Sequence, residues 1–572
     1  MSKELALKSI NIDGDIWDMN LDYADRNNVT SLFMSEGNIH PYPAKAVPDM
    51  VRDLLSKIKD LYGVKNVLDP FVGSGTVALE SKLLGLDFYG SDLNPLAVLL
   101  ARTKSLTIEG TPYVKEQLEN FASSINEKSM KEVLFGIANF KNIDYWFKEK
   151  NIEQLSYIKH CIGKFLREAP LNYREVFSLI ILTAFSATIR ESSLTRNEEF
   201  KLYRLSPADI ENFNVNTIGV FSRRIKELLE MVQDVNAAFN SNAKSEIYLS
   251  NAKNINYLGH TKVDLILTSP PYGDSQSTVA YGQFSRLSLQ WMSDLMKNYL
   301  GIDTLYENCD EYLLGGKYSI SVDLEESTNK ILDSSNTLRK LISDIDELTK
   351  AELKTLELAR ITLIEFLDNL KNSKDNINNK IIFTNDMLSS LIKEKIRLHI
   401  FRKINSNIKL EKKKIKSLTT SETSKFLSDL MNENSKRYKR RFATFSSLLP
   451  NVLEAINRRI KLLPKRGKEI LDFFIDLNKA VEESNKVLSD EGIQVWIVGH
   501  RTVLGKLNVN LANILLEWFE SISYNKIALI KRTCHFKRLP RRINSTVTRN
   551  KGIETMVEEY VLIVQKNYSA TK

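Results

Sequence analysis

Two glycines and an alanine near the N-terminus have the spacing of a ligand-binding turn. Gly73, Gly75 and Ala78 satisfy the pattern G-x-G-x-x-A, directly after a predicted strand and at the start of a predicted helix. Gly73 permits a tight turn, Gly75 lets a ligand approach the backbone, and Ala78 lets the helix pack closely on the strand. Taken alone, this pattern fits a purely structural turn equally well.

Two carboxylates flank the turn and restrict the ligands that it suits. Asp92 ends the next predicted strand, where a carboxylate accepts hydrogen bonds from ribose hydroxyls in NAD and S-adenosylmethionine sites alike. Asp69 precedes the glycines, and an anion there would repel the pyrophosphate of NAD but attract a sulfonium or ammonium group. The charges therefore favour S-adenosylmethionine, with NAD as the alternative cofactor.

A second motif, Ser269-Pro270-Pro271-Tyr272, follows a predicted buried strand at residues 263–268. The two prolines lack N–H donors, so carbonyl oxygens and the serine hydroxyl are left to accept hydrogen bonds. These acceptors suit an exocyclic amino group, whose lone pair they would direct at an electrophile, while Tyr272 offers a flat face for stacking a base. A loop with a packed tyrosine is the structural alternative, but open α/β sheets bind ligands at such strand ends.

Short apolar runs that alternate with helical patterns are expected to position both motifs. The predicted strands cover residues 64–69, 87–90, 247–249, 263–268 and 493–498. Buried strands that alternate with helices predict a parallel α/β sheet. Residues 526–531 and 560–565 flank a polar, basic loop, and we expect them to form an antiparallel strand pair.

Two helical blocks are expected to interrupt this sheet. Residues 317–449 contain neither glycine nor proline, which predicts helices with short polar joints. Apolar residues at three- and four-residue steps over 338–370 favour a helical hairpin packed on itself. The expected segments are 1–104 with the first half of the sheet, a helical insertion at 105–240, the part of the sheet with the second motif at 241–292, a long helical insertion at 293–480, and the last strands with a basic loop at 481–572.

The composition of the 572-residue chain excludes several classes of protein. It is 43% hydrophobic and 26% charged, as expected of a soluble globular protein and not of a largely disordered one. No apolar run approaches the roughly twenty residues of a membrane span, and the N-terminus lacks the apolar region of a signal peptide. Three cysteines are too few for a disulfide framework, so we expect a reducing, cytoplasmic setting. The spacing of histidines and cysteines indicates no metal site. The net charge of +9 suits a polyanionic partner.

Three stretches together resemble the amino-directed DNA methyltransferases. They are residues 69–75 with the glycine turn, 91–95 with the second carboxylate, and 268–272 with the proline motif. Ser269 makes that motif similar to members acting on the 4-amino group of cytosine, whereas adenine-directed members usually carry Asp or Asn there.

Further stretches extend the resemblance, which covers less than half of the chain. Residues 40–45 resemble the cofactor-side motif that precedes the sheet, and 492–501 resemble the fifth strand. Asn251 stands where the family usually has an Asp near the adenine ring.

The resemblance implies a Rossmann-like, seven-stranded, mostly parallel methyltransferase sheet with an antiparallel last strand and large helical insertions. S-adenosylmethionine would be the cofactor, and the target cytosine would be flipped out of double-stranded DNA and methylated directly at N4. A cognate restriction endonuclease acting on the same site would be a partner. The implied cofactor-binding residues are His40, Lys45, Asp69, Phe71, Gly73, Ser74, Gly75, Asp92, Asn94 and Asn251, and the implied catalytic residues are Ser269, Pro270, Pro271 and Tyr272.

Cations mixed with polar side chains are candidates for contacts with DNA, because arginine suits both phosphates and guanine edges. These candidates are Arg190, Arg196, Gln283, Arg286, Arg538, Arg541 and Arg542, with a salt-bridged surface as the alternative reading. Either helical insertion could read the target sequence, and the longer one could also dimerise. An adenine-N6 DNA or RNA amino methyltransferase is the nearest alternative function. An NAD-dependent oxidoreductase and a non-catalytic DNA-binding or scaffold protein follow it.

Overall fold

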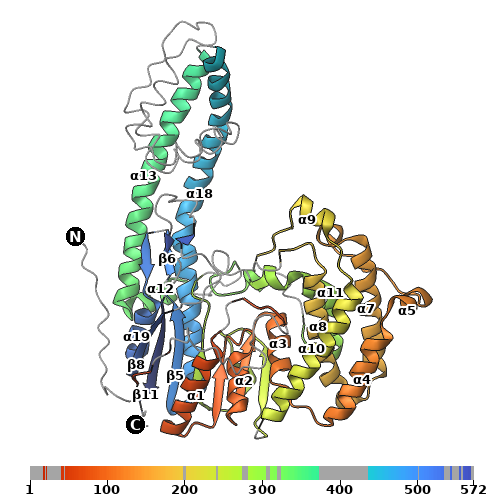
Figure 1. The fold of residues 1–572 in the computed structure, drawn as a ribbon. Helices are drawn as coiled ribbons and strands as arrows, with labels where there is room; N and C mark the ends of the chain where they lie inside the picture. The colour runs from red at the N-terminus through yellow and green to blue at the C-terminus, as the bar shows by residue number, and fades with distance from the viewer. Residues whose placement is uncertain are drawn as a thin grey trace.

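The computed structural model describes most of the chain, with gaps. The described residues are 17–19, 21, 40–43, 46–196, 201–239, 242–273, 281–303, 309–317, 324–372, 436–499, 501–504, 506–533, 542–543, 553–554 and 558–567. They form an α/β core with a block of helices at one side and a long helical hairpin that projects away from the sheet (Figure 1).

A seven-stranded sheet forms the centre of the core. In spatial order its strands are β3 (Ser245–Leu249), β2 (Asp87–Asp92), β1 (Asn66–Asp69), β4 (Val263–Thr268), β5 (Leu488–Gly499), β11 (Glu558–Lys566) and β8 (Tyr524–Thr533). Neighbouring strands are parallel except that β11 is antiparallel to both β5 and β8. This confirms the expected mostly parallel sheet with an antiparallel last strand, including the predicted strand pair near the C-terminus.

The sheet is buried on both faces because alternate residues of its strands enter different hydrophobic cores. Leu265 and Leu267 of β4 belong to one core, whereas Ile266 between them belongs to the other. Val495 and Trp496 of β5 divide between the two cores in the same way. Since side chains alternate along a strand, a strand covered on both sides reads as a continuous apolar run.

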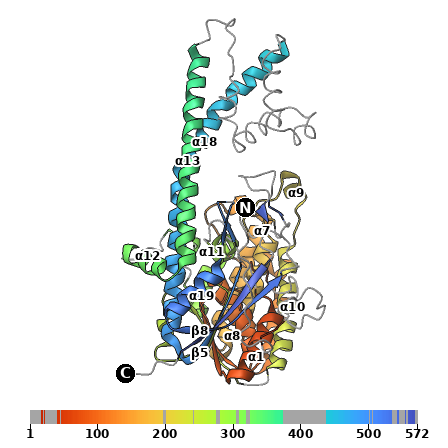
Figure 2. The ribbon, with the colours of Figure 1, turned by 90° about the vertical axis from the view of Figure 1, so that its left-hand side faces the viewer.

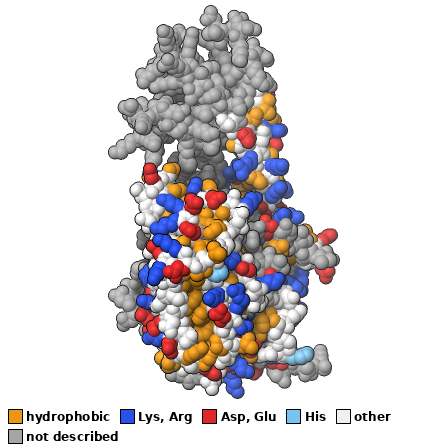
Figure 3. Space-filling view, turned by 90° about the vertical axis from the view of Figure 1, so that its right-hand side faces the viewer, with side chains coloured by type: hydrophobic (Ala, Val, Ile, Leu, Met, Phe, Trp, Pro, Cys, Tyr) orange, Lys and Arg blue, Asp and Glu red, His pale blue; other side chains and the backbone are white. Residues whose placement is uncertain are grey.

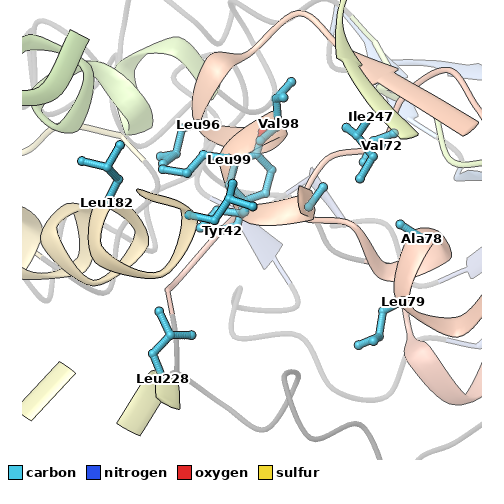
Figure 4. Packing of buried hydrophobic residues seen from close by; sticks show 14 of the residues in the cluster. Tyr42, Val72, Ala78, Leu79, Leu96, Val98, Leu99, Leu182, Leu228 and Ile247 are labelled. Atoms are coloured by element: carbon cyan, nitrogen blue, oxygen red, sulfur yellow. The ribbon is translucent and has the colours of Figure 1, made fainter. Parts of the chain in front are cut away.

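One core joins the sheet to helices on its first face. These are α1 (Pro48–Tyr62), α2 (Thr76–Leu83), α3 (Pro95–Lys104) and α11 (Tyr281–Leu300). The insertion between β2 and β3 adds α4 (Thr111–Ser124), α5 (Glu127–Glu132), α6 (Ile143–Trp146), α7 (Glu149–Glu168), α8 (Leu171–Glu191), α9 (Pro207–Asn212) and α10 (Thr217–Ala238). α8 packs against α3, α10 and α11, so the insertion is part of the same core. Figure 4 shows this continuity, with Val72 from the turn after β1, Leu96 from α3 and Leu182 from α8.

The second core carries the long helices and several short elements. The helices are α12 (Leu324–Asp333), α13 (Asn336–Asn372), α18 (Lys436–Val487) and α19 (Leu511–Ser521), and the short elements are η1 (Asn256–Leu258) and the pair β6 (Arg501–Val503) and β7 (Leu507–Val509). Outside this core, η2 (Cys309–Glu311) contacts α11, and β9 (Arg542–Ile543) pairs with β10 (Ile553–Glu554). α13 and α18 pack against each other and extend beyond the sheet (Figures 1 and 2). Leu338, Leu341 and Ile345 are buried, as their three- and four-residue spacing predicts. An ion pair between Arg459 and Glu352 also joins the two helices.

None of the helices in the described part of the chain is both long and apolar enough to cross a membrane. Cys161 and Cys309 are free thiols, and Cys534 lies outside the described residues. Within those same residues, no group of three or more His, Cys, Asp or Glu side chains is arranged to hold a metal ion.

Candidate active site

β1 and β4 are neighbours in the sheet, so the two predicted motifs meet at its carboxyl edge. Leu68 of β1 pairs with Ile266 of β4. Just beyond this pair, the Thr268 hydroxyl donates a hydrogen bond of 2.6 Å to Asp69 Oδ1. The glycine turn and the Ser269–Tyr272 motif therefore leave the sheet from adjoining strand ends.

The glycine turn adopts a backbone conformation that favours glycine at two positions. Gly73 has φ 53° and Gly75 has φ 82°. A Cβ on Gly75 would lie 2.6 Å from Ala101 Cα in α3, whereas a Cβ on Gly73 would meet nothing closer than 3.8 Å. Gly75 therefore allows α3 to pack on the turn, which differs from its predicted role in ligand approach. Gly73 is therefore the glycine of the turn whose backbone a ligand could approach.

Gly75→Ala should destabilise the fold much more than Gly73→Ala, because only Gly75 combines a positive φ with a backbone clash. Strain at such a φ costs about 1–3 kcal/mol, and overpacking adds about 1–3 kcal/mol. We therefore expect the free energy of unfolding to fall by about 2–6 kcal/mol in Gly75→Ala and by about 1–3 kcal/mol in Gly73→Ala. Urea denaturation measures both values, and equal losses would contradict the packing role of Gly75.

Two carboxylates hold the backbone of this turn. Asp92, the last residue of β2, accepts hydrogen bonds from the amides of Gly73 at 2.9 Å and Asn94 at 2.8 Å. Asp69 accepts one from the amide of Phe71 at 2.9 Å. Burial raises the pKa of Asp69 to about 7 and that of Asp92 to about 6. Neither carboxylate forms an ion pair with another described residue, so the site suits a ligand that brings positive charge or hydrogen-bond donors.

Ser74 adds an unsatisfied hydroxyl to the turn. The residue is 4% exposed, and its Oγ has no hydrogen-bond partner among the residues that the structure describes. Buried hydroxyls in folded proteins nearly always have a partner. A polar ligand atom at the turn would supply one.

Residues 40–43 pack beside the turn and tie it to two helices. The Asn94 amide donates hydrogen bonds to Tyr42 Oη at 3.1 Å and to Ser285 Oγ of α11 at 2.7 Å. His40 is buried, and its Nε2 lies 2.7 Å from Ser186 Oγ of α8. Through these contacts His40 and Asn94 stabilise the turn. Lys45 lies outside the described residues.

Asn251 lies at the same edge of the sheet, where β3 ends beside β2. The amide of its neighbour Ser250 donates a 3.1 Å hydrogen bond to the Asp92 carbonyl oxygen. Asn251 Oδ1 accepts one of 3.0 Å from the Lys253 amide, which fixes a local turn. The predicted residue is therefore next to Asp92, while Phe71 is half-buried against the second core.

The Ser269–Tyr272 motif leaves β4 with its two hydroxyls close together. Ser269 Oγ lies 3.2 Å from Tyr272 Oη. Pro270 is buried, whereas Ser269, Pro271 and Tyr272 are half-buried. Burial raises the pKa of Tyr272 well above its ordinary value, so its hydroxyl stays protonated at neutral pH. The motif thus presents two hydroxyl groups at the strand end next to the glycine turn.

Three residues that the sequence analysis missed also lie at this edge. Tyr272 Oη donates a 3.4 Å hydrogen bond to Glu559 Oε1 of β11, and Glu559 forms an ion pair with Arg532 of β8. Arg501 of β6 lies against Gly273, where any Cβ would collide with its guanidinium group. The predicted C-terminal strands, 526–531 and 560–565, each end one residue short of Arg532 and Glu559, so the sequence indicated the strand pair but not this contact.

The predicted DNA contacts fall in different environments. Arg190 is 4% exposed, and its guanidinium lies 3.8 Å from the centre of the Phe284 ring. This burial leaves it no surface for a phosphate, which corrects the expectation that it contacts DNA. Gln283 and Arg286 lie in the first turns of α11, where Asp310 accepts a 3.0 Å hydrogen bond from the Gln283 amide.

The remaining predicted contacts are exposed or only partly described. Arg196 is exposed in the loop after α8. Arg538 and Arg541 lie outside the described residues, and only the backbone of Arg542, in β9, is described. The face shown in Figure 3 mixes basic and acidic side chains, so it does not form a uniformly basic surface.

The chain is 27% identical to the Type II methyltransferase M.MvaI of Kocuria varians over 540 residues, which cover 92% of this chain and 90% of that protein. These two proteins are similar over almost their whole length. Shorter similarities are 30% identity over 88 residues to the Type II methyltransferase M.MjaII of Methanocaldococcus jannaschii, and 27% over 111 residues to M.BsoBI of Geobacillus stearothermophilus. The chain spans 16% and 21% of those two proteins. No family model matches the chain, and no solved structure matches it significantly. The relatives support a methyltransferase family.

Proposed function

We propose that this chain is a cytoplasmic, S-adenosylmethionine-dependent DNA methyltransferase that methylates N4 of cytosine in double-stranded DNA. The observation that carries the proposal is the Thr268–Asp69 hydrogen bond, because it joins the glycine turn to the amine-accepting motif. The similarity to a Type II methyltransferase over 92% of the chain supports it. A role in restriction–modification, with a cognate endonuclease acting on the same site, is part of the proposal.

The glycine turn suits S-adenosylmethionine better than NAD. Asp92 would accept hydrogen bonds from the ribose hydroxyls, Asp69 would attract the cationic groups, and Ser74 would pair its unsatisfied hydroxyl. A pyrophosphate beside two carboxylates would be repelled, which disfavours an NAD-dependent oxidoreductase. When bound, the cofactor supplies an electrophilic methyl group. Lys45, Phe71, Gly73 and Asn251 are further proposed to contact it, whereas His40, Gly75 and Asn94 would act by supporting the turn.

The affinity for S-adenosylmethionine should fall as the pH drops below 7. The pKa values of about 7 for Asp69 and about 6 for Asp92 belong to the free protein, and a cationic ligand favours both ionised carboxylates. Below each pKa the ligand must displace a proton, so log affinity loses about one unit per pH unit for each carboxylate. Calorimetry from pH 5 to 8.5 measures this dependence. If the affinity did not change over that range, neither carboxylate would be in contact with the cofactor.

The stability of the unliganded protein should change with pH in the opposite sense. An unfolded Asp has a pKa of about 3.9, so the folded chain binds more protons than the unfolded chain between about pH 4 and 7. The contribution of these two groups to stability therefore increases as the pH falls through that range.

The proline motif would hold the target amino group and not attack the base. Ser269 Oγ and the Pro270 carbonyl would accept the two N–H groups, so the nitrogen lone pair points at the methyl group. Tyr272 would stack on the flipped base, offsetting an unpairing cost of a few kcal/mol. Alignment of this kind supplies about 7–11 kcal/mol of a barrier. The amino nitrogen would gain the methyl group as the carbon–sulfur bond of the sulfonium breaks to leave a neutral thioether, and the nitrogen would release one proton to solvent.

We propose cationic and polar side chains from the set identified in the sequence as the DNA contacts. They are Arg196 and Arg286, with Gln283, Arg538, Arg541 and Arg542. Either helical insertion would read the target sequence.

Nucleoside analysis after methyl transfer tests the proposal. The purified chain is incubated with S-adenosylmethionine and mixed-sequence duplex DNA, which is then digested and separated by mass. We expect N4-methylcytosine. Formation of N6-methyladenine would contradict the assignment of cytosine as the target base. In a parallel reaction with RNA, methylation of RNA but not of DNA would contradict the DNA assignment. Absence of any methylated product would contradict the proposed methyltransferase activity. A Ser269→Ala/Tyr272→Ala double variant is the control for a contaminating activity.

A further inference from the structure

A chain of polar groups runs from the proline motif into the C-terminal strand pair. Tyr272 Oη lies 3.2 Å from Ser269 Oγ and donates to Glu559 Oε1 at 3.4 Å. Glu559 Oε2 accepts from Arg532 Nε at 2.8 Å and lies 2.6 Å from Arg532 Nη2. Because both guanidinium contacts use Oε2, the other carboxylate oxygen faces Tyr272.

The sheet topology brings this ion pair to the proposed active site. β11 is antiparallel, so its first residues lie at the edge where the parallel strands end. Glu559 pairs with Gly499, the last residue of β5, and with Arg532 near the end of β8. The side chains of Arg532 and Glu559 are 8% and 13% exposed, so the pair is held in place and shielded from solvent.

The ion pair fixes the direction of the hydrogen bonds in this chain. A carboxylate only accepts hydrogen bonds, and a hydroxyl has one proton to donate. Tyr272 donates its proton to Glu559, so the bond between Tyr272 and Ser269 must use the proton of Ser269. The lone pairs of Ser269 Oγ are then left for a ligand. The raised pKa of Tyr272 keeps this arrangement intact at neutral pH.

We infer that Glu559 is a positioning residue that makes Ser269 an acceptor for an amino group and prevents it from donating to a carbonyl oxygen. This inference rests on the proposed function and explains how the site would discriminate between bases. Cytosine offers an N–H group at position 4, whereas uracil offers an oxygen that would face the Ser269 lone pairs. Without the carboxylate, Tyr272 could donate to Ser269, and Ser269 could donate to the base.

Glu559→Gln tests the inference because its amide can donate to Tyr272 and reverse the chain. The assay uses duplexes that carry the target site, identified beforehand by sequencing methylated DNA. We expect kcat to fall by about 10- to 100-fold, less than the roughly 100- to 1,000-fold for removal of a preorganised group itself, because Ser269 is still present. The dissociation constant of S-adenosylmethionine should stay unchanged. Base preference is measured as the dissociation constant of a duplex with uracil at the target position divided by that of the duplex with cytosine. This ratio should fall by about tenfold or more. Wild-type values of kcat and of this preference would overturn the inference.

Glu558→Gln is the matched control. Glu558 is the adjacent residue of β11, forms a 2.7 Å ion pair with Lys531 of β8, and accepts a 3.2 Å hydrogen bond from Tyr560 Oη. It therefore has the same kinds of partners as Glu559, but its contacts with Lys531 and Tyr560 do not lead to Ser269. We expect wild-type kcat and base preference in this variant. If kcat and base preference fell as much in Glu558→Gln as in Glu559→Gln, disruption of any ion pair between β8 and β11 would explain the loss. That result would overturn the inference.

Tyr272→Phe separates a positioning role from a purely structural one. It keeps the ring and the Arg532–Glu559 pair but removes the hydroxyl that links them to Ser269. We expect the same loss as in Glu559→Gln, and no further loss in the double variant, because both changes break one chain. Additive losses would overturn the inference. If Glu559→Gln does not fold, full kcat and base preference in Tyr272→Phe would overturn it alone. Failure of the proposed function would appear separately, as absent methyl transfer by the wild-type protein.

Discussion

Ser269→Ala is expected to lower kcat for methyl transfer by about 100- to 1,000-fold, the range seen when one preorganised polar group is removed from an active site. Ser269 Oγ lies at the end of β4, next to the strand end that carries the glycine turn, and would hold one of the two amino protons. The serine is not part of the turn, so the dissociation constant of S-adenosylmethionine should not change. A tritium-transfer assay and calorimetry measure the two quantities.

Ser489→Ala is the matched control for this variant. Ser489 lies in β5, next to β4 but at the opposite end of the sheet, where its hydroxyl donates a 3.0 Å hydrogen bond to the Val263 carbonyl. Removing that hydroxyl should leave kcat unaltered. A wild-type rate of methyl transfer in Ser269→Ala would contradict the proposal that this residue holds the target amino group.

Asp92→Ala is expected to weaken S-adenosylmethionine binding by about 10- to 150-fold, since hydrogen bonds to a charged group contribute about 1.5–3 kcal/mol. The structure gives a second reason for a large effect. Asp92 also accepts hydrogen bonds from the amides of Gly73 and Asn94, so the variant loosens the accessible part of the turn. Calorimetry with wild-type and variant protein at pH 8, where both carboxylates are ionised, measures the change.

Asp87→Ala provides the comparison, because Asp87 is the first residue of the same strand and Asp92 the last. Asp87 Oδ1 accepts a 2.8 Å hydrogen bond from the Lys244 amide, so this variant also loses a backbone contact. Binding should remain at the wild-type level, since β2 separates the residue from the turn. An Asp92→Ala variant that binds as tightly as wild type would show that the carboxylate has no contact with the cofactor.

Local patterns were sufficient to predict the sheet and the two motifs at its edge. The strands that carry Asp69, Asp92 and Ser269 are buried apolar runs followed by turn residues, and both signals lie within a few residues of each other in the sequence. The stretch without glycine or proline predicted a long helix such as α13 but not its partner, because α18 extends beyond that stretch and contains Pro450, Pro464 and Gly467.

Long-range packing was not predictable from those patterns. The sequence assigns Gly75 to ligand approach, but the absence of a Cβ there is required by Ala101, which packs against it from α3. The sequence assigns Arg190 to DNA contact, yet it lies in the last turn of α8, whose residues 177–190 are all buried. The Glu559–Arg532 pair depends on the register between two strands, which the strand signals themselves do not specify.

The structure of a ternary complex tests most directly whether the glycine turn and the proline motif form one site. The protein would be crystallised with S-adenosylhomocysteine and a duplex that carries its target sequence. We predict the sulfur atom between the Asp69–Gly75 turn and Ser269, with a flipped cytosine stacked on Tyr272 and its amino group directed at Ser269. A cofactor product bound away from Gly73, or a target base remote from Ser269, would contradict the account.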